Sequence, residues 1–142
     1  MNERIGSIAN YLVALGLLSS GMIYLFKNSF MSYHSEALSL DWKEVENSTQ
    51  FLILALMRAV SGGWIAVAIV IIVLQRKFTL TKISWIPWLI FATGLIVSFV
   101  TIYATLIVRI NSPGKPPNAN LIVGIVLLII GFIFNQKALK RN

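Results

Sequence analysis

The stretch that decides the fold is Phe51–Leu74, which reads FLILALMRAVSGGWIAVAIVIIVL. An α-helix rises 1.5 Å per residue, so this run is long enough to cross the roughly 30 Å hydrocarbon core of a bilayer. Its only charged residue is Arg58. We therefore predict a membrane-spanning helix with one arginine inside it.

Three further apolar runs lie on either side of this stretch, and composition agrees with them. The chain of 142 residues is 57% hydrophobic and 12% charged, against about 25% charged in soluble domains. We predict an all-α, four-helix transmembrane bundle that forms a single domain over residues 1–142. A long structured loop joins its first two helices. The expected spans are about 5–26, 51–74, 84–108 and 120–139.

The third and fourth spans are separated by clear local signals. Pro87 falls in the first turn of the third helix, where its missing N–H costs nothing. The segment 111–118, which reads NSPGKPPN, cannot continue a helix and marks the next loop.

Composition also excludes several kinds of site. The chain has no cysteine and a single histidine, His34, so thiol chemistry, thiolate metal sites and multi-histidine cages are excluded. We expect no cofactor and no metal. The net charge of +7 comes from residues beside apolar runs, so we expect the lipid bilayer and not nucleic acid as the partner of this charge.

The basic residues also predict orientation. The side that carries both termini holds seven Lys and Arg residues, and the opposite side holds four. The positive-inside rule then places both termini in the cytoplasm of a multi-pass protein of the cell (inner) membrane.

The first loop, between Lys27 and Gln50, is too long to be a simple turn. It holds four of the five acidic residues and the segment that contains Tyr33, His34 and Glu36. This segment is either a proton-transfer or metal-binding group at the outer membrane surface, or an interfacial loop held by hydrogen bonds. Its three named residues are candidates for ligand binding. Further on, the sequence from Asp41 to Glu44 has the spacing of a capping box. A helix that starts there either runs on into the second span or breaks at residues 47–49.

Arg58 is the most informative residue of the chain. A charge inside a span normally faces protein or water. Arg58 also lies on the same side of a helical wheel as several small residues, and small residues favour close helix packing. We therefore expect Arg58 to face the bundle interior, about 10 Å below the outer end of its helix. The alternative is that it snorkels outward and anchors the helix. The small residues are Ala55, Ala59, Gly62 and Ala66.

Counting from the outer end of each span places Ser20 and Thr101 at about the depth of Arg58, with Tyr103 just above. These groups would form an outward-facing polar pocket. No span contains an acidic residue, so the counter-charge of Arg58 would be Glu36, or else Glu46, or an anionic lipid or small ligand.

The segments 31–38 (MSYHSEAL) and 54–63 (LALMRAVSGG), with Trp42 and Gln50 between them, resemble a pattern found in small four-span bacterial membrane proteins. Ser32 stands where that pattern often has proline. The resemblance implies that the first loop and Arg58 belong to one unit, and it implies no particular activity.

Two classes of function fit these residues. The first, which we favour, is an accessory or ligand- or lipid-binding bundle with its polar pocket around Arg58. The second is a small membrane enzyme in which His34 or Glu36 carries a proton and Arg58 clamps an anionic substrate. A transporter would need at least a dimer. A homo-oligomer or a membrane partner protein would use the small residues Ala55, Ala59, Gly124 or Gly131.

Overall fold

The structure is a computed structural model of the chain, and it describes residues 2–140. These residues are all-helical, as predicted, and four of the helices are long and apolar enough to cross a membrane. The protein is therefore a membrane protein of the helical class. Its elements are α1 (Asn2–Phe26), α2 (Ser32–Leu38), the 3-10 helix η1 (Trp42–Glu44), α3 (Asn47–Thr81), α4 (Ile86–Asn111) and α5 (Asn118–Leu139).

The longest helix, α3, exceeds the predicted span at both ends. Its 35 residues correspond to about 52 Å at 1.5 Å per residue. The apolar run stops at Leu74, but the helix continues for seven residues, and Gln75 and Phe78 in this extension are fully buried. The helix ends where Lys82 takes a left-handed conformation and donates its N–H to the carbonyl of Phe78 at 2.9 Å. Packing against other helices therefore extends α3 beyond its apolar segment.

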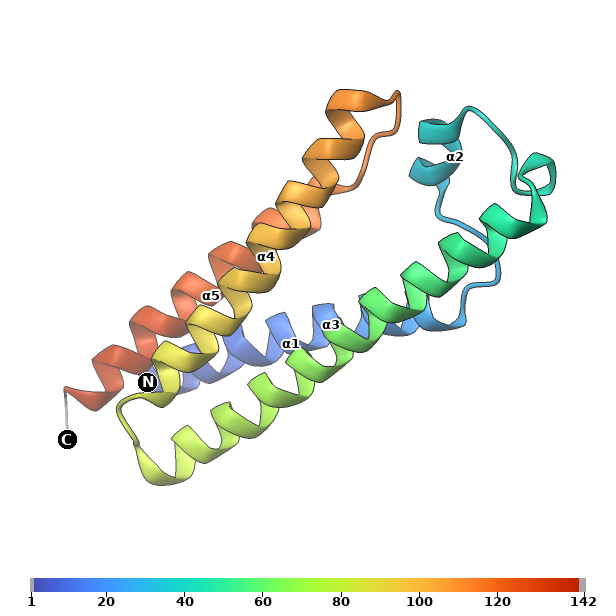
Figure 1. The fold of residues 1–142 in the computed structure, drawn as a ribbon. Helices are drawn as coiled ribbons and strands as arrows, with labels where there is room; N and C mark the ends of the chain where they lie inside the picture. Colours follow the sequence, from blue (N-terminus) through green and yellow to red (C-terminus); the bar gives the residue numbers. More distant parts are fainter. Residues whose placement is uncertain (1, 141–142) are drawn as a thin grey trace.

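The two ends of the bundle differ in their connections. Both described ends of the chain and the short α3–α4 turn lie together, at what we call the terminal end (Figure 1). The opposite, loop end carries the long first loop and the loop between α4 and α5. Pro87 lies in the first turn of α4, as predicted.

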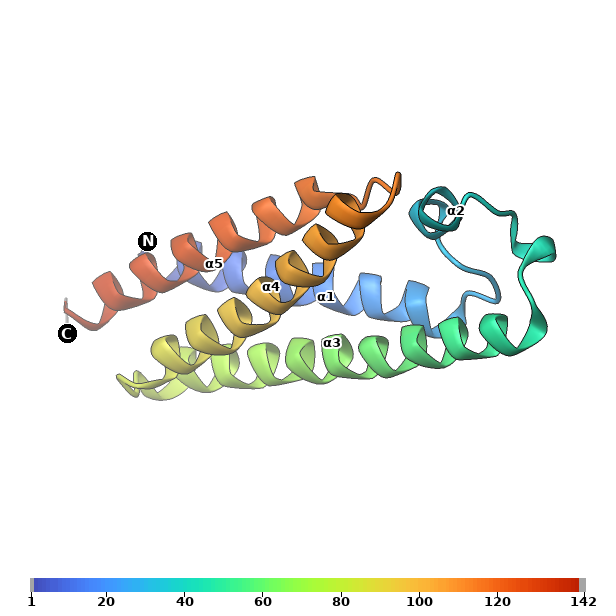
Figure 2. The same cartoon turned by 45° about the horizontal axis from the view of Figure 1, so that its top comes forward.

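The four long helices pack together at the terminal end and separate into two pairs toward the loop end. α1 packs against α3 and α5, and α4 packs against α5 and α3. We call α1 with α3 the first arm and α4 with α5 the second arm. The arms meet at the terminal end and diverge toward the loop end in both views (Figures 1 and 2).

Burial follows this divergence. The last buried residue of α4 is Ser98, and the first buried residue of α5 is Leu128. The halves of α4 and α5 nearer the loop end therefore bury no residue, so the four-helix core lies at the terminal end. Its apolar members are Val13, Ala14, Ala68, Ile71, Phe78, Ile86, Ile90 and Leu128.

The first loop contains more regular structure than the sequence predicted, because α2 had no counterpart among the expected elements. The capping box is confirmed: the N–H of Asp41 donates to Oε2 of Glu44 at 2.8 Å. The helix that it starts is the single turn η1, since Val45 is extended. The helix therefore does not run on into the second span, but the break falls at Val45 and Glu46, and the expected break at residues 47–49 is wrong because those residues form the first turn of α3.

Candidate functional site

Arg58 lies on the exposed surface of α3. The Glu3–Lys82 pair is the one ion pair among residues 2–140, so Arg58 has no acidic partner there. The prediction that the small residues beside it form a packed face inside the bundle is wrong for the single chain. A Cβ added at Gly62 would meet no atom within 4 Å. All four small residues are exposed: Ala55, Ala59, Gly62 and Ala66.

The register between α1 and α3 also corrects the depth of Arg58. Asn10 bonds Gln75, and the backbone of Gly21 packs on the carbonyl of Ser61. Extending these pairs along the antiparallel helices brings Arg58 level with the last turn of α1, near residues 24–27. Ser20 is level with α3 residues at least one turn deeper, about 6 Å or more away along the axis. The depth count was wrong because α3 starts well beyond the end of α1.

The other predicted pocket residues are on separate surfaces. Ser20 and Tyr103 are exposed and Thr101 is half-buried, its hydroxyl donating to the carbonyl of Val97 at 2.8 Å. Thr101 and Tyr103 belong to the half of α4 that stands away from α3 (Figure 1). The structure therefore does not bring these groups together with Arg58. A shallow hollow at the loop end is lined instead by Arg109, Ser112, Pro113, Gly114, Lys115 and Pro116.

Glu36 bonds the second arm and not Arg58. Its Oε2 accepts the backbone N–H of Lys115 at 3.0 Å. The second choice of counter-charge, Glu46, is the exposed residue before α3. Neither predicted acidic partner pairs with Arg58.

Tyr33 and His34 also make structural contacts. The hydroxyl of Tyr33 lies 2.5 Å from that of Tyr24, and Nδ1 of His34 accepts the N–H of Met31 at 3.2 Å. Burial raises the pKa of Tyr33 above its ordinary value, and the bond with Tyr24 adds to this shift. Burial lowers the pKa of His34. His34 is therefore a neutral residue that caps the first turn of α2 at neutral pH.

A cluster of buried polar side chains that the sequence did not predict lies at the terminal end. Asn10, Gln75 and Asn135 are each at most 1% exposed. Oε1 of Gln75 accepts Nδ2 of Asn10 at 2.7 Å and Nδ2 of Asn135 at 2.8 Å. We call these three residues the amide cluster. It joins α1, α3 and α5 with one acceptor.

The two asparagines occupy equivalent surroundings. Each follows a glycine by four residues, Gly6 before Asn10 and Gly131 before Asn135. Because α1 and α5 are antiparallel, the glycine of each helix lies under the asparagine of the other, and a Cβ at either glycine would overlap the Oδ1 that faces it. This arrangement lets the two backbones approach closely. Gly131 is thus used within the bundle, so it is not free for the oligomer contact that we expected there.

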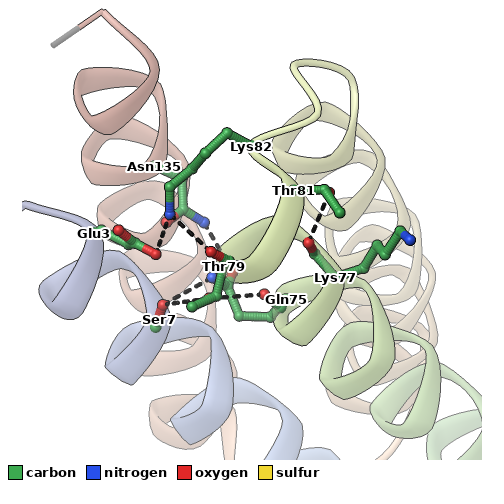
Figure 3. A network of polar contacts seen from close by, with 8 residues as sticks. All are labelled: Glu3, Ser7, Gln75, Lys77, Thr79, Thr81, Lys82 and Asn135. Carbon is green, nitrogen blue, oxygen red and sulfur yellow. Dashed lines mark hydrogen bonds and ion pairs between the residues drawn. The ribbon is translucent and has the colours of Figure 1, made fainter. Parts of the chain in front are cut away.

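Hydrogen bonds connect the amide cluster to the surface of the terminal end. Nε2 of Gln75 donates to Oγ of Ser7 at 2.9 Å, and Oγ of Ser7 lies 3.5 Å from Oγ1 of Thr79 (Figure 3). Above them Lys82 forms its ion pair with Glu3 and donates to the carbonyl of Thr79 at 3.0 Å. The deep part of this network carries no titratable side chain. It therefore suits helix association and not proton transfer.

A sequence signal for this cluster did exist. Asn10 and Asn135 each follow a glycine in the same four-residue spacing, inside apolar runs. Uncharged amides in spans commonly bond across helices. Gln75 gave no such signal, because it stands beside Arg76 and Lys77 and reads as the end of the span.

No family model matches this chain, and no curated protein or solved structure matches it either. The fold and the contacts therefore define the class on their own: a membrane protein with four helices of spanning length. The amide cluster joins α1, α3 and α5 at the terminal end, and Arg58 is exposed on α3, the second of the four spanning helices.

Proposed function

We propose that this protein is a non-enzymatic, lipid-binding bundle of the cell membrane, and that Arg58 binds the headgroup of an anionic phospholipid. The observation that carries the proposal is the exposed guanidinium on a spanning helix, without an acidic partner in residues 2–140. A cation at an apolar surface needs a counter-charge, and a lipid phosphate supplies one with the geometry that a guanidinium prefers.

Depth supports a headgroup as the ligand. Arg76 and Lys77 are exposed at the terminal end of the apolar segment and suit one membrane interface. Arg58 is 18 residues away, or about 27 Å along the helix, close to the roughly 30 Å thickness of the hydrocarbon core. When Arg76 lies at one interface, Arg58 therefore lies near the other, where phosphates are found.

The surface around Arg58 supports a lipid chain below the headgroup. Ala59 and Gly62 are exposed on the same face and leave open space beside the helix. Larger apolar side chains are exposed farther along the same face toward the terminal end, with Ile69 at 52% and Val73 at 59%. An acyl chain can therefore lie along this face of α3 while the headgroup stays at Arg58.

The enzyme alternative receives no support from these contacts. His34 and Glu36 bond backbone N–H groups of Met31 and Lys115, and neither contacts Arg58. The proposal therefore assigns them no catalytic role.

The orientation proposed with this function keeps both termini in the cytoplasm and Arg58 in the outer leaflet. The excess of basic residues on the terminal side supports this orientation. A reporter fused to the C-terminus that is active only in the cytoplasm should be active, and a reporter active only outside should be silent. The reverse result would overturn the orientation without touching lipid binding.

Native mass spectrometry of the purified protein tests lipid binding. Wild-type protein incubated with phosphatidylglycerol or phosphatidylcholine should retain the anionic lipid preferentially. Arg58→Gln should lose this preference. Arg109→Gln is the matched control. Arg109 is also an exposed arginine, but it lies in the last turn of α4 and lines the hollow with residues of the α4–α5 loop, not an open apolar helix face, so its replacement should behave like wild type. Equal retention in all three proteins, or a stable dimer that hides the Arg58 face from lipid, would overturn the proposal.

A further inference from the structure

The short helix α2 lies between the two arms at the loop end. In both views it stands close to the α4–α5 loop, while its own chain connects α1 to α3 (Figures 1 and 2). It is therefore placed where it can hold the two arms to each other.

One side of α2 is fixed to the first arm. The hydroxyls of Tyr33 and Tyr24 are 2.5 Å apart, and the ring of Tyr24 packs on Trp64 of α3 with centroids 4.9 Å apart. Just before α2, the buried Phe30 packs edge-on against Trp42 with centroids 5.0 Å apart. These aromatic contacts join α2, α1, η1 and α3 into one unit.

The other side of α2 contacts the second arm. Glu36 accepts the N–H of Lys115 at 3.0 Å. Gly114 is buried beneath α2, where an added Cβ would lie 2.7 Å from the carbonyl oxygen of Tyr33 and 2.8 Å from Cβ of Ala37. Those atoms belong to the helix itself and not to a flexible side-chain end. Any side chain at residue 114 must therefore push α2 and the loop apart.

Toward the loop end the helices of the second arm themselves bury nothing, and the buried residues there are Gly114 and Pro116 of the α4–α5 loop. No residue of α4 after Ser98 and no residue of α5 before Leu128 is buried among the described residues. The arms are joined firmly at the terminal end, through the amide cluster and the apolar core. The contact of α2 with residues 114–115 thus bridges two arms that otherwise diverge.

We propose that α2 is a strap that sets the separation of the two arms, and that its release from the α4–α5 loop lets the second arm swing away from the first about the terminal end. This motion is controlled by the hydrogen bond between Glu36 and Lys115 and by the close contact at Gly114, and neither of these contacts involves Arg58. The proposal is independent of the ligand of Arg58.

Distances between spin labels test the strap. The chain has no cysteine, so labels can be attached at Phe51→Cys and Ile110→Cys, which are 72% and 77% exposed on the two arms. Double electron–electron resonance of the labelled protein in phosphatidylcholine nanodiscs measures the distance between the two labels. Gly114→Ala should shift the distance distribution to longer values and broaden it. The matched control is Gly124→Ala, since a Cβ there meets no atom within 4 Å, and it should leave the distribution unchanged.

A second pair of variants keeps the test valid if Gly114→Ala does not fold. Glu36→Ala removes the acceptor of the Lys115 N–H and should produce a smaller shift in the same direction. Glu46→Ala removes an exposed acid of the same loop and should produce none. Distributions for Glu36→Ala and a folded Gly114→Ala that match their controls would overturn the proposal.

Discussion

Asn10 on α1 and Gln75 on α3 are joined by a hydrogen bond of 2.7 Å between side chains that are almost completely buried. The same oxygen of Gln75 accepts Asn135. A buried amide that loses its partner pays the full cost of desolvation. The position of Gln75 therefore holds three helices together through one atom.

Replacing Gln75 with leucine should destabilise the bundle by about 1–3 kcal/mol, because two buried donors lose their acceptor. Unfolding titrations in mixed detergent micelles measure this change. The control is Gln136→Leu, since Nε2 of Gln136 is buried without a hydrogen-bond partner, and this substitution should leave the free energy of unfolding unchanged or raise it. Equal effects of the two substitutions would show that the amide cluster does not hold the helices.

Gly131→Ala should destabilise the protein, although glycine to alanine within a helix ordinarily stabilises it by about 0.5–1 kcal/mol. The new Cβ would overlap Oδ1 of Asn10 and push α5 away from α1. Gly16→Ala is the matched control, because a Cβ there meets no atom within 4 Å. In the same unfolding assay Gly16→Ala should be neutral or stabilising. A stabilising Gly131→Ala would contradict the close approach.

The fold could be predicted from sequence because each spanning helix contains a long, mostly apolar run. Phe51–Leu74, with Arg58 as its one charged residue, predicts a spanning helix by itself. The arrangement of the polar groups could not be predicted in the same way. Arg58 was expected inside because its neighbours are small, but a single helix does not show which face meets another helix. Its depth depended on the register between α1 and α3, which only the paired contacts of Asn10 and Gly21 supply.

The first turn of α2 should weaken on acidification. Burial lowers the folded-state pKa of His34 below its ordinary value of 6.5, so the unfolded loop binds the proton more strongly. The stabilisation by neutral His34 is complete above about pH 6.5, and it is lost as the pH falls through the lowered pKa. Protonation also puts a hydrogen on Nδ1, which then cannot accept the N–H of Met31.

Hydrogen exchange measures this effect at the Met31 amide. After correction for the intrinsic pH dependence, its protection should be lower at pH 5 than at pH 7.5. His34→Gln keeps an acceptor in reach without titrating in this range, so its protection should not depend on pH. Protection that rises on acidification in the wild type would contradict the assignment.

A cysteine in place of Arg58 should react with a membrane-impermeant maleimide faster than a cysteine in place of Ser20. Both positions are exposed on the single chain, but the register places Ser20 at least one helical turn deeper. Labelling of reconstituted protein measures the two rates. Equally slow labelling of both cysteines would show that residue 58 lies in the interior of the bilayer.

The association of spin-labelled lipids with the protein in a mixed bilayer measures most directly whether Arg58 binds an anionic headgroup. Wild-type protein should prefer phosphatidylglycerol to phosphatidylcholine by about fivefold, which corresponds to ~1 kcal/mol for one basic residue near the membrane surface. The preference should weaken with salt. In Arg58→Gln it should disappear, while Arg109→Gln keeps it. An unchanged preference in Arg58→Gln would show that Arg58 does not bind the anionic headgroup.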